Sequence, residues 1–201
     1  THGLEAVREA WGAGLGVMGE NKVQEAAAKI PLCVSGPDWH LIGHLQKNKV
    51  RHALTLFQMI HSVDTLELLQ AIDRISDEDG HSPHILLETN VSGESSKFGI
   101  RPDALPGMVE AALSCRNITL DGFMTMAPFS TNPEDSRPHF ARLRGLRDEM
   151  ERRFGAGFPV LSMGMSGDYA VAVEEGATMV RIGTALFGAR EKRFGGWGIE
   201  N

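Results

Sequence analysis

Apolar residues along the chain alternate between short runs, typical of buried strands, and longer stretches in which they recur every three or four residues, typical of helices. The first helical stretch begins almost at residue 1, with Leu4, Val7 and Trp11 on one face. Seven short runs follow, at residues 15–19, 39–42, 59–63, 84–91, 118–126, 158–163 and 178–182. Further helical stretches separate or follow them, at residues 21–30, 45–54, 65–75, 103–114, 133–154 and 168–175. The pattern therefore predicts seven strands, each followed by a helix or by its beginning.

Strands that alternate with helices pair in parallel through right-handed crossovers. Two α/β architectures suit this order, a (β/α)8 TIM barrel and an open doubly wound sheet. We favour the barrel, because a chain that opens in a helix and continues through seven strands has the order of a barrel that lacks its first strand. The length of 201 residues, against about 250 for a typical barrel, agrees. We expect a single barrel domain over residues 1–201, with the first strand upstream of Thr1.

Composition narrows the class of protein. Hydrophobic residues make up 42% of the chain and charged residues 23%, values typical of a folded soluble domain. A net charge of -6 argues against a dedicated nucleic-acid binder, although it allows a local basic pocket. The two cysteines, Cys33 and Cys115, indicate neither a disulfide framework nor a thiolate zinc site, and favour a reducing cytoplasm. We also expect no membrane span, because no apolar run reaches the required length of about 18 to 20 residues. We expect no export signal, because the sequence does not open with a charged segment followed by an apolar stretch.

The loops after the last two predicted strands contain the strongest functional signal. In TIM barrels a phosphate is often held by the loops after strands seven and eight. One of these loops places Ser166 among glycines just before a helix, where unpaired backbone N–H groups stabilise an anion. The other contains Arg181, a fixed cation, followed by Gly183, which permits close backbone approach, and the Thr184 hydroxyl. The alternative interpretation is that Ser166 or Asp168 only caps the helix.

Asn21 and several other polar residues permit more than one interpretation. Asn21 stands at a strand-to-helix junction, where it could hydrogen-bond a ligand or serve as the N-cap of the helix. Glu20 could act as an acid or a base, but a solvated carboxylate is the simpler interpretation. His40 and His44 are separated by Gly43 in a strand-to-loop segment, so a zinc site on one helical face is not expected. The chain also lacks the full Gly-x-Ser-x-Gly pattern of a hydrolase and the glycine-rich cradles for dinucleotides and nucleoside triphosphates.

Six segments, in order and with their spacing, resemble the YggS-type pyridoxal phosphate homeostasis protein family. They are GENKVQEA (19–26), WHLIGHLQKNKV (39–50), IHSVDTLEL (60–68), SGESSKFGI (92–100), LDGFMTMAP (120–128) and LSMGMSGDYAVAVEEGATMVRIGTALFGAR (161–190). The resemblance covers nearly the whole chain and is more specific than any single motif.

This resemblance implies a barrel similar to the N-terminal domain of alanine racemase, with pyridoxal 5'-phosphate (PLP) as the cofactor. It implies that Ser166, Gly183 and Thr184 hold the phosphate, that Arg181 lies near the pyridine nitrogen, and that Asn21 lies near the ring. It also implies a lysine that forms a Schiff base with PLP at the end of the first strand. This lysine is expected just before Thr1.

The expected function is to hold and deliver PLP inside the cell, without robust racemase activity. A fixed cation at Arg181 disfavours protonation of the ring nitrogen, on which racemisation depends. The only tyrosine, Tyr169, is predicted on a helix, whereas alanine racemase takes its second base, a tyrosine, from another domain and subunit. A PLP-dependent racemase-like enzyme is the alternative. The expected partners are PLP and PLP-dependent apoenzymes, the expected location is cytoplasmic, and the expected state is a monomer.

Overall fold

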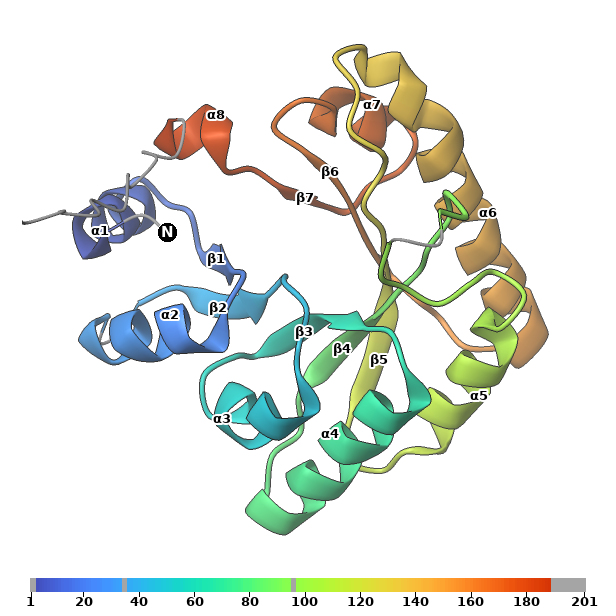
Figure 1. Cartoon of the computed structure of the whole chain (residues 1–201), viewed down its shortest axis with the longest axis horizontal. Coiled ribbons are helices and arrows are strands. Elements are labelled where there is room, and N and C mark those ends of the chain that lie inside the picture. The colour runs from blue at the N-terminus through green and yellow to red at the C-terminus, as the bar shows by residue number, and fades with distance from the viewer. Residues whose placement is uncertain (1–2, 34–35, 95–96, 189–201) are drawn as a thin grey trace, which may run out of the picture.

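The computed structural model describes residues 3–33, 36–94 and 97–188. Its strands form one parallel sheet in which sequence order and spatial order coincide. They are Val17–Glu20 (β1), Asp38–Leu41 (β2), Met59–Val63 (β3), His84–Glu88 (β4), Thr119–Met124 (β5), Val160–Met165 (β6) and Met179–Arg181 (β7). The sheet curves into a nearly closed barrel with β1 and β7 as its two outer strands (Figure 1). The prediction of a parallel α/β barrel is confirmed.

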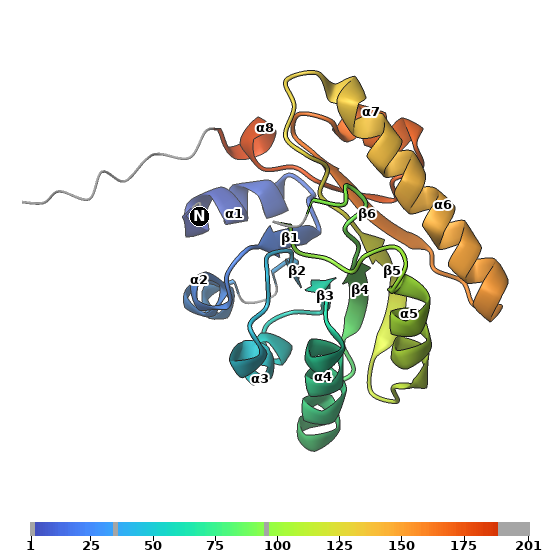
Figure 2. The same ribbon diagram turned by 45° about the vertical axis from the view of Figure 1, so that its right-hand side comes forward.

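Helices surround the outer face of this sheet (Figure 2). They are Leu4–Gly12 (α1), Val23–Lys29 (α2), Val50–Leu54 (α3), Leu66–Asp79 (α4), Leu105–Ser114 (α5), Arg137–Phe154 (α6), Tyr169–Glu174 (α7) and Thr184–Phe187 (α8). Three short 3-10 segments accompany them, at Ile30–Leu32 (η1), Lys47–Lys49 (η2) and Pro133–Ser136 (η3). Among the described residues, none of these helices is long and apolar enough to cross a bilayer.

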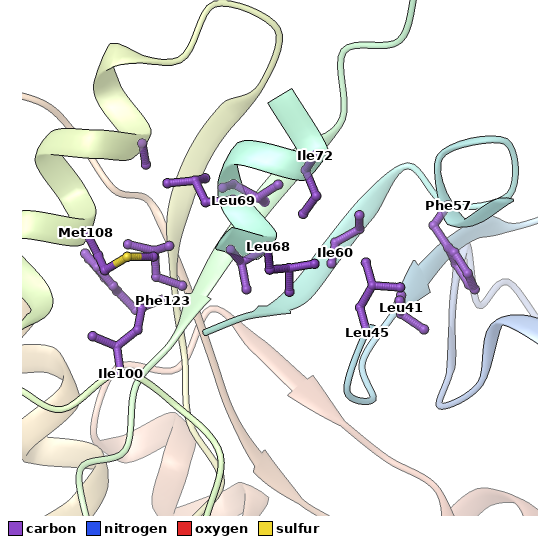
Figure 3. Packing of buried hydrophobic residues seen from close by; sticks show 14 of the residues in the cluster. Leu41, Leu45, Phe57, Ile60, Leu68, Leu69, Ile72, Ile100, Met108 and Phe123 are labelled. Atoms are coloured by element: carbon purple, nitrogen blue, oxygen red, sulfur yellow. The ribbon is translucent and has the colours of Figure 1, made fainter. Parts of the chain in front are cut away.

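In the middle of the sheet, β3 and nearly all of β4 are buried on both faces, as parallel strands covered by helices require, whereas β1 and β7 at its edges are partly exposed. The larger hydrophobic core fills the space between the sheet and the helices. Figure 3 shows Leu68, Leu69 and Ile72 of α4 lying over the strands near Ile60 of β3. All four side chains are at most 3% exposed, and each such side chain stabilises the fold by about 1.5–3 kcal/mol through burial.

A second, smaller apolar cluster fills the inside of the barrel. It consists of Met59, Leu86 and Met124, with Val160 and Met179 packed against them. Successive side chains of a strand point to opposite faces, so the residues two positions further along these strands also point inward. On β3, β4, β6 and β7 those residues are polar: His61, Glu88, Ser162 and Arg181.

Some predicted element boundaries differ from those in the structure. The strand expected over 84–91 ends at Glu88, because the chain leaves the ladder and Thr89 forms an isolated bridge with Ile100. The helix expected over 45–54 begins as the 3-10 turn η2 and becomes α-helical only at Val50. After the last strand the sequence predicted only the beginning of a helix, and the structure has the short helix α8 there.

Candidate functional site

The loops after β6 and β7 meet at the carboxyl end of the barrel. The Ser166 Oγ accepts hydrogen bonds from the backbone N–H of Gly183 and of Ala185, each at 3.2 Å. Ser166 is half-buried, whereas Gly183 and Thr184 are exposed. The structure thus brings together the three residues for which the sequence predicts phosphate binding, with backbone donors at the start of α8 directed at a hydroxyl.

The end of β6 and the loop after it depend on Gly164 and Asp168. Gly164 has φ +90°, and a Cβ there would lie 2.5 Å from the Ala172 Cβ, so a larger residue would be both strained and obstructed. Asp168 stands at the N-cap position of α7 but makes no cap hydrogen bond. Its carboxylate instead accepts from Met165 N at 2.7 Å and from the Ser136 hydroxyl at 2.9 Å. The interpretation of Ser166 or Asp168 as only a helix cap is therefore wrong for α7: Asp168 closes the loop, and Ser166 faces α8.

Arg181 extends from β7 into the barrel and joins it to the neighbouring strands. Its Nη1 donates to the Ser162 carbonyl at 2.8 Å and to the Ser162 Oγ at 2.7 Å, and its Nη2 donates to the Thr125 carbonyl at 2.8 Å. Burial lowers the pKa of Arg181 to about 10, against the attraction of Glu88 and Asp168. The guanidinium is thus a cation at neutral pH. Within the described part of the chain, its Nε–H and one Nη2–H remain available for a ligand.

A layer of inward-facing polar side chains, which the apolar pattern did not predict, lies beside Arg181. Its other members are His40, His61, Glu88 and Ser162, all at most 8% exposed. The His40 Nδ1 lies 3.0 Å from the His61 Nε2, and the His61 Nδ1 lies 3.0 Å from the Ser162 Oγ. The signal was present in the sequence: on four strands a polar residue stands two positions after an apolar one that fills the barrel.

Burial determines the protonation of this polar layer. It lowers the pKa of His61 to about 3, with the nearby His40 and Arg181 acting in the same direction, and it also lowers the pKa of His40. Both imidazoles are therefore neutral at physiological pH. For Glu88, burial raises the pKa to about 7; the negative charge of Asp64 adds to this, and Arg181 opposes it.

The end of β1 places Asn21 in an exposed position at the same end of the barrel. Its backbone packs against Gly43, where a Cβ would lie 2.2 Å from the Asn21 carbonyl oxygen. The prediction of Asn21 as an N-cap is wrong, because Lys22 occupies the N-cap position of α2. Among the described residues, no hydrogen bond joins the Asn21 side chain to the group around Ser166 and Arg181.

Two other expectations for polar residues need correction or placement. Glu20 is not a solvated carboxylate: its side chain is buried against α2 and forms an ion pair with Lys29. His44 stacks on Phe98, with ring centroids 4.2 Å apart, and its Nδ1 lies 3.7 Å from an Asp64 carboxylate oxygen.

Comparisons with known proteins place this arrangement in a family. Residues 1–191 match the family model described as alanine racemase, N-terminal domain. A pyridoxal phosphate homeostasis protein of Aquifex aeolicus is 44% identical over 188 residues, which cover 93% of this chain and 82% of the relative. One of Pseudomonas aeruginosa is 43% identical over 92% of this chain and 80% of the relative. The chain belongs to the pyridoxal phosphate homeostasis protein family.

Solved structures of this family share the fold. PipY of Synechococcus elongatus, in a structure with PLP bound, is 37% identical with a TM-score of 0.87, and the match covers 94% of this chain and 89% of PipY. An alanine racemase of Clostridium difficile, 14% identical, has a TM-score of 0.79 over 94% of this chain and 49% of the racemase. The latter likeness concerns the fold alone. The family resemblance inferred from the six sequence segments is thereby confirmed.

Proposed function

We propose that this chain binds PLP at the carboxyl end of the barrel and acts in PLP homeostasis by holding the cofactor and delivering it. PLP presents a phosphate dianion, a pyridine ring whose nitrogen accepts a hydrogen bond when unprotonated, and an aldehyde. When bound, it supplies a carbonyl that reacts with amines and a ring that withdraws electrons. The observation that carries the proposal is the convergence of Ser166 Oγ and the N–H groups of Gly183 and Ala185.

The donors at this end of the barrel fit such a ligand. The two backbone N–H groups and the hydroxyls of Ser166 and Thr184 suit phosphate oxygens, which accept hydrogen bonds and are stabilised at a helix start. Arg181 offers only donors, so it suits an unprotonated pyridine nitrogen. Asn21 is placed by this proposal near the ring.

Arg181 favours a binding role over a racemase role. Its guanidinium stays charged because Glu88 and Asp168 oppose the effect of burial, and a neighbouring cation disfavours protonation of the pyridine. An unprotonated ring is a weak electron sink, so the residues of this chain bind and orient PLP without promoting racemisation. The alternative, a racemase-like enzyme, predicts robust formation of D-alanine from L-alanine by the PLP-loaded protein, whereas we expect little or none.

Binding is tested with pyridoxine 5'-phosphate, which lacks the aldehyde and so reports on the noncovalent site alone. Ser166→Ala should weaken its binding about 10- to 100-fold, because a hydrogen bond to a charged group contributes about 1.5–3 kcal/mol. Ser114→Ala is the matched control, since Ser114 is exposed at the end of α5, far from Ser166 in the sequence, and donates to the Glu110 carbonyl. Absence of saturable binding by the unaltered protein would refute the proposal.

The remaining parts of the proposal concern the molecule in the cell. We propose a monomeric, single-domain, cytoplasmic protein that passes PLP to apoenzymes. Light scattering after gel filtration should give the mass of one chain, and denaturant unfolding should show one cooperative transition. Mixing the PLP-loaded protein with a PLP-dependent apoenzyme should restore that enzyme's activity. The recovery should be faster than when a dialysis membrane separates the two proteins, so that only released PLP reaches the apoenzyme.

A further inference from the structure

Four side chains from four strands form a continuous hydrogen-bonded chain across the inside of the barrel. His40 of β2 contacts His61 of β3 at 3.0 Å, and His61 contacts Ser162 of β6, also at 3.0 Å. Ser162 in turn accepts from Arg181 of β7 at 2.7 Å. His61 and Ser162 are at most 1% exposed, so solvent cannot substitute for any of these contacts.

The chemistry of Arg181 gives this chain one direction. A guanidinium can only donate, so the Ser162 Oγ is an acceptor toward Nη1. The Ser162 hydroxyl has one proton of its own, and among the described residues the acceptor within reach is the His61 Nδ1. The proton of neutral His61 then lies on Nε2 and is donated to the His40 Nδ1. Both imidazoles are thereby fixed as Nε2–H tautomers.

We propose that His61 is a positioning residue for Arg181. By accepting the Ser162 proton, it keeps the lone pairs of the Ser162 oxygen turned toward the guanidinium. The bonds from Nη1 to Ser162 and from Nη2 to Thr125 then hold the guanidinium plane and present its remaining N–H groups to a ligand. The identity of that ligand as the PLP ring rests on the proposed function, whereas the tautomers and the rigidity of Arg181 do not.

The direction of the chain is tested in the ligand-free protein by NMR of the histidine ring nitrogens. Both His61 and His40 should appear as neutral Nε2–H tautomers at pH 7. His52→Gln, which removes an exposed histidine of α3 that is not part of the hydrogen-bonded chain, provides a control for assignment. An Nδ1–H tautomer of His61, or a charged His61 at pH 7, would overturn the inference.

The positioning role is tested with His61→Leu and His61→Gln. Leucine offers Ser162 no acceptor, so the separate Nη signals of Arg181 expected for a held guanidinium should merge through faster rotation. Glutamine offers an oxygen to Ser162 and an NH2 group to His40, so it should keep those signals separate. If His61→Leu does not fold, Ser162→Ala tests the same link, because it removes the hydroxyl and leaves the backbone carbonyl. Unchanged Arg181 signals in the folded His61→Leu or Ser162→Ala protein would refute the proposal.

Ligand binding gives the second measurement. His61→Leu should weaken pyridoxine 5'-phosphate binding about tenfold and change the absorption spectrum of the bound ring, and His61→Gln should restore both. A lack of binding by the unaltered protein would count against the proposed function and leave the NMR result to decide the role of His61. Binding and a spectrum in His61→Leu equal to those of the unaltered protein would refute the positioning role.

Discussion

Glu88→Gln should stabilise the protein, and the gain should depend on pH. Glu88 is 8% exposed, and the pKa of its carboxyl is raised from 4.5 to about 7 by burial and by Asp64. Between these two pH values the unfolded chain releases the Glu88 proton while the folded chain retains it, so ionisation favours unfolding. Stability from this group is therefore full below pH 4.5 and is lost as the pH rises through 7. The gap between the pKa values of Glu88 in the folded and unfolded chain, at about 1.4 kcal/mol per pH unit, corresponds to a loss of about 3 kcal/mol in the free energy of unfolding.

The measurement is the free energy of unfolding in urea from pH 4.5 to pH 8.5, for the unaltered protein and Glu88→Gln. The two should be nearly equal at pH 4.5, and the variant should become more stable by up to about 3 kcal/mol above pH 7. Glu110→Gln, at an exposed position of α5, is the matched control and should show no comparable gain. A difference between Glu88→Gln and the unaltered protein that does not grow with pH, or that grows in the opposite direction, would refute the reasoning.

Two further predictions concern packing and thiol chemistry. Gly43→Ala should lower the free energy of unfolding by about 1–3 kcal/mol, because its Cβ would lie 2.2 Å from the Asn21 carbonyl oxygen, whereas Gly107→Ala in the open space on α5 should stabilise by up to about 1 kcal/mol. Thermal unfolding checks both, and equal effects would contradict the close approach at Gly43. Burial and Asp73 raise the pKa of Cys115 to about 11. Iodoacetamide at pH 8 should therefore alkylate the Cys115 thiol far more slowly than it alkylates the thiol of glutathione, and mass spectrometry measures both rates. Alkylation at the glutathione rate would show that the thiol is not held in this environment.

The sequence predicted the barrel and the loops of the site because both depend on local signals. Alternating apolar patterns identified the seven strands, and the glycines and hydroxyls near Ser166 and Gly183 pointed to two loops that the structure brings together. The positions of the helix starts were less predictable: Asn21 has the right side chain for an N-cap, but the close packing of its backbone on Gly43 leaves Lys22 in that position. Such a contact between two strand ends has no local signature.

The polar layer inside the barrel escaped prediction for a related reason. His61 and Ser162 are 101 positions apart, and only closure of the sheet brings them within 3.0 Å. Each of them alone suggests an ordinary strand residue that happens to be polar. Inward-facing residues recur at every second position of each strand, and those of different strands meet in one layer only when the strands pair in the right register. The apolar pattern does not specify that register.

Within that layer, removal of neighbouring buried groups should change the free energy of unfolding in opposite directions. His40, His61, Ser162 and Arg181 satisfy one another, and the loss of one member leaves another buried without its partner, which costs about 1–3 kcal/mol. Glu88 lies outside this chain, and among the described residues its carboxylate accepts no hydrogen bond, so its ionised form gains only the attraction of Arg181. Burial alone therefore does not decide whether a polar residue stabilises this barrel. The hydrogen bonds make His40, His61, Ser162 and Arg181 stabilising, whereas burial and Asp64 raise the pKa of Glu88 to about 7, so that its ionisation destabilises the fold.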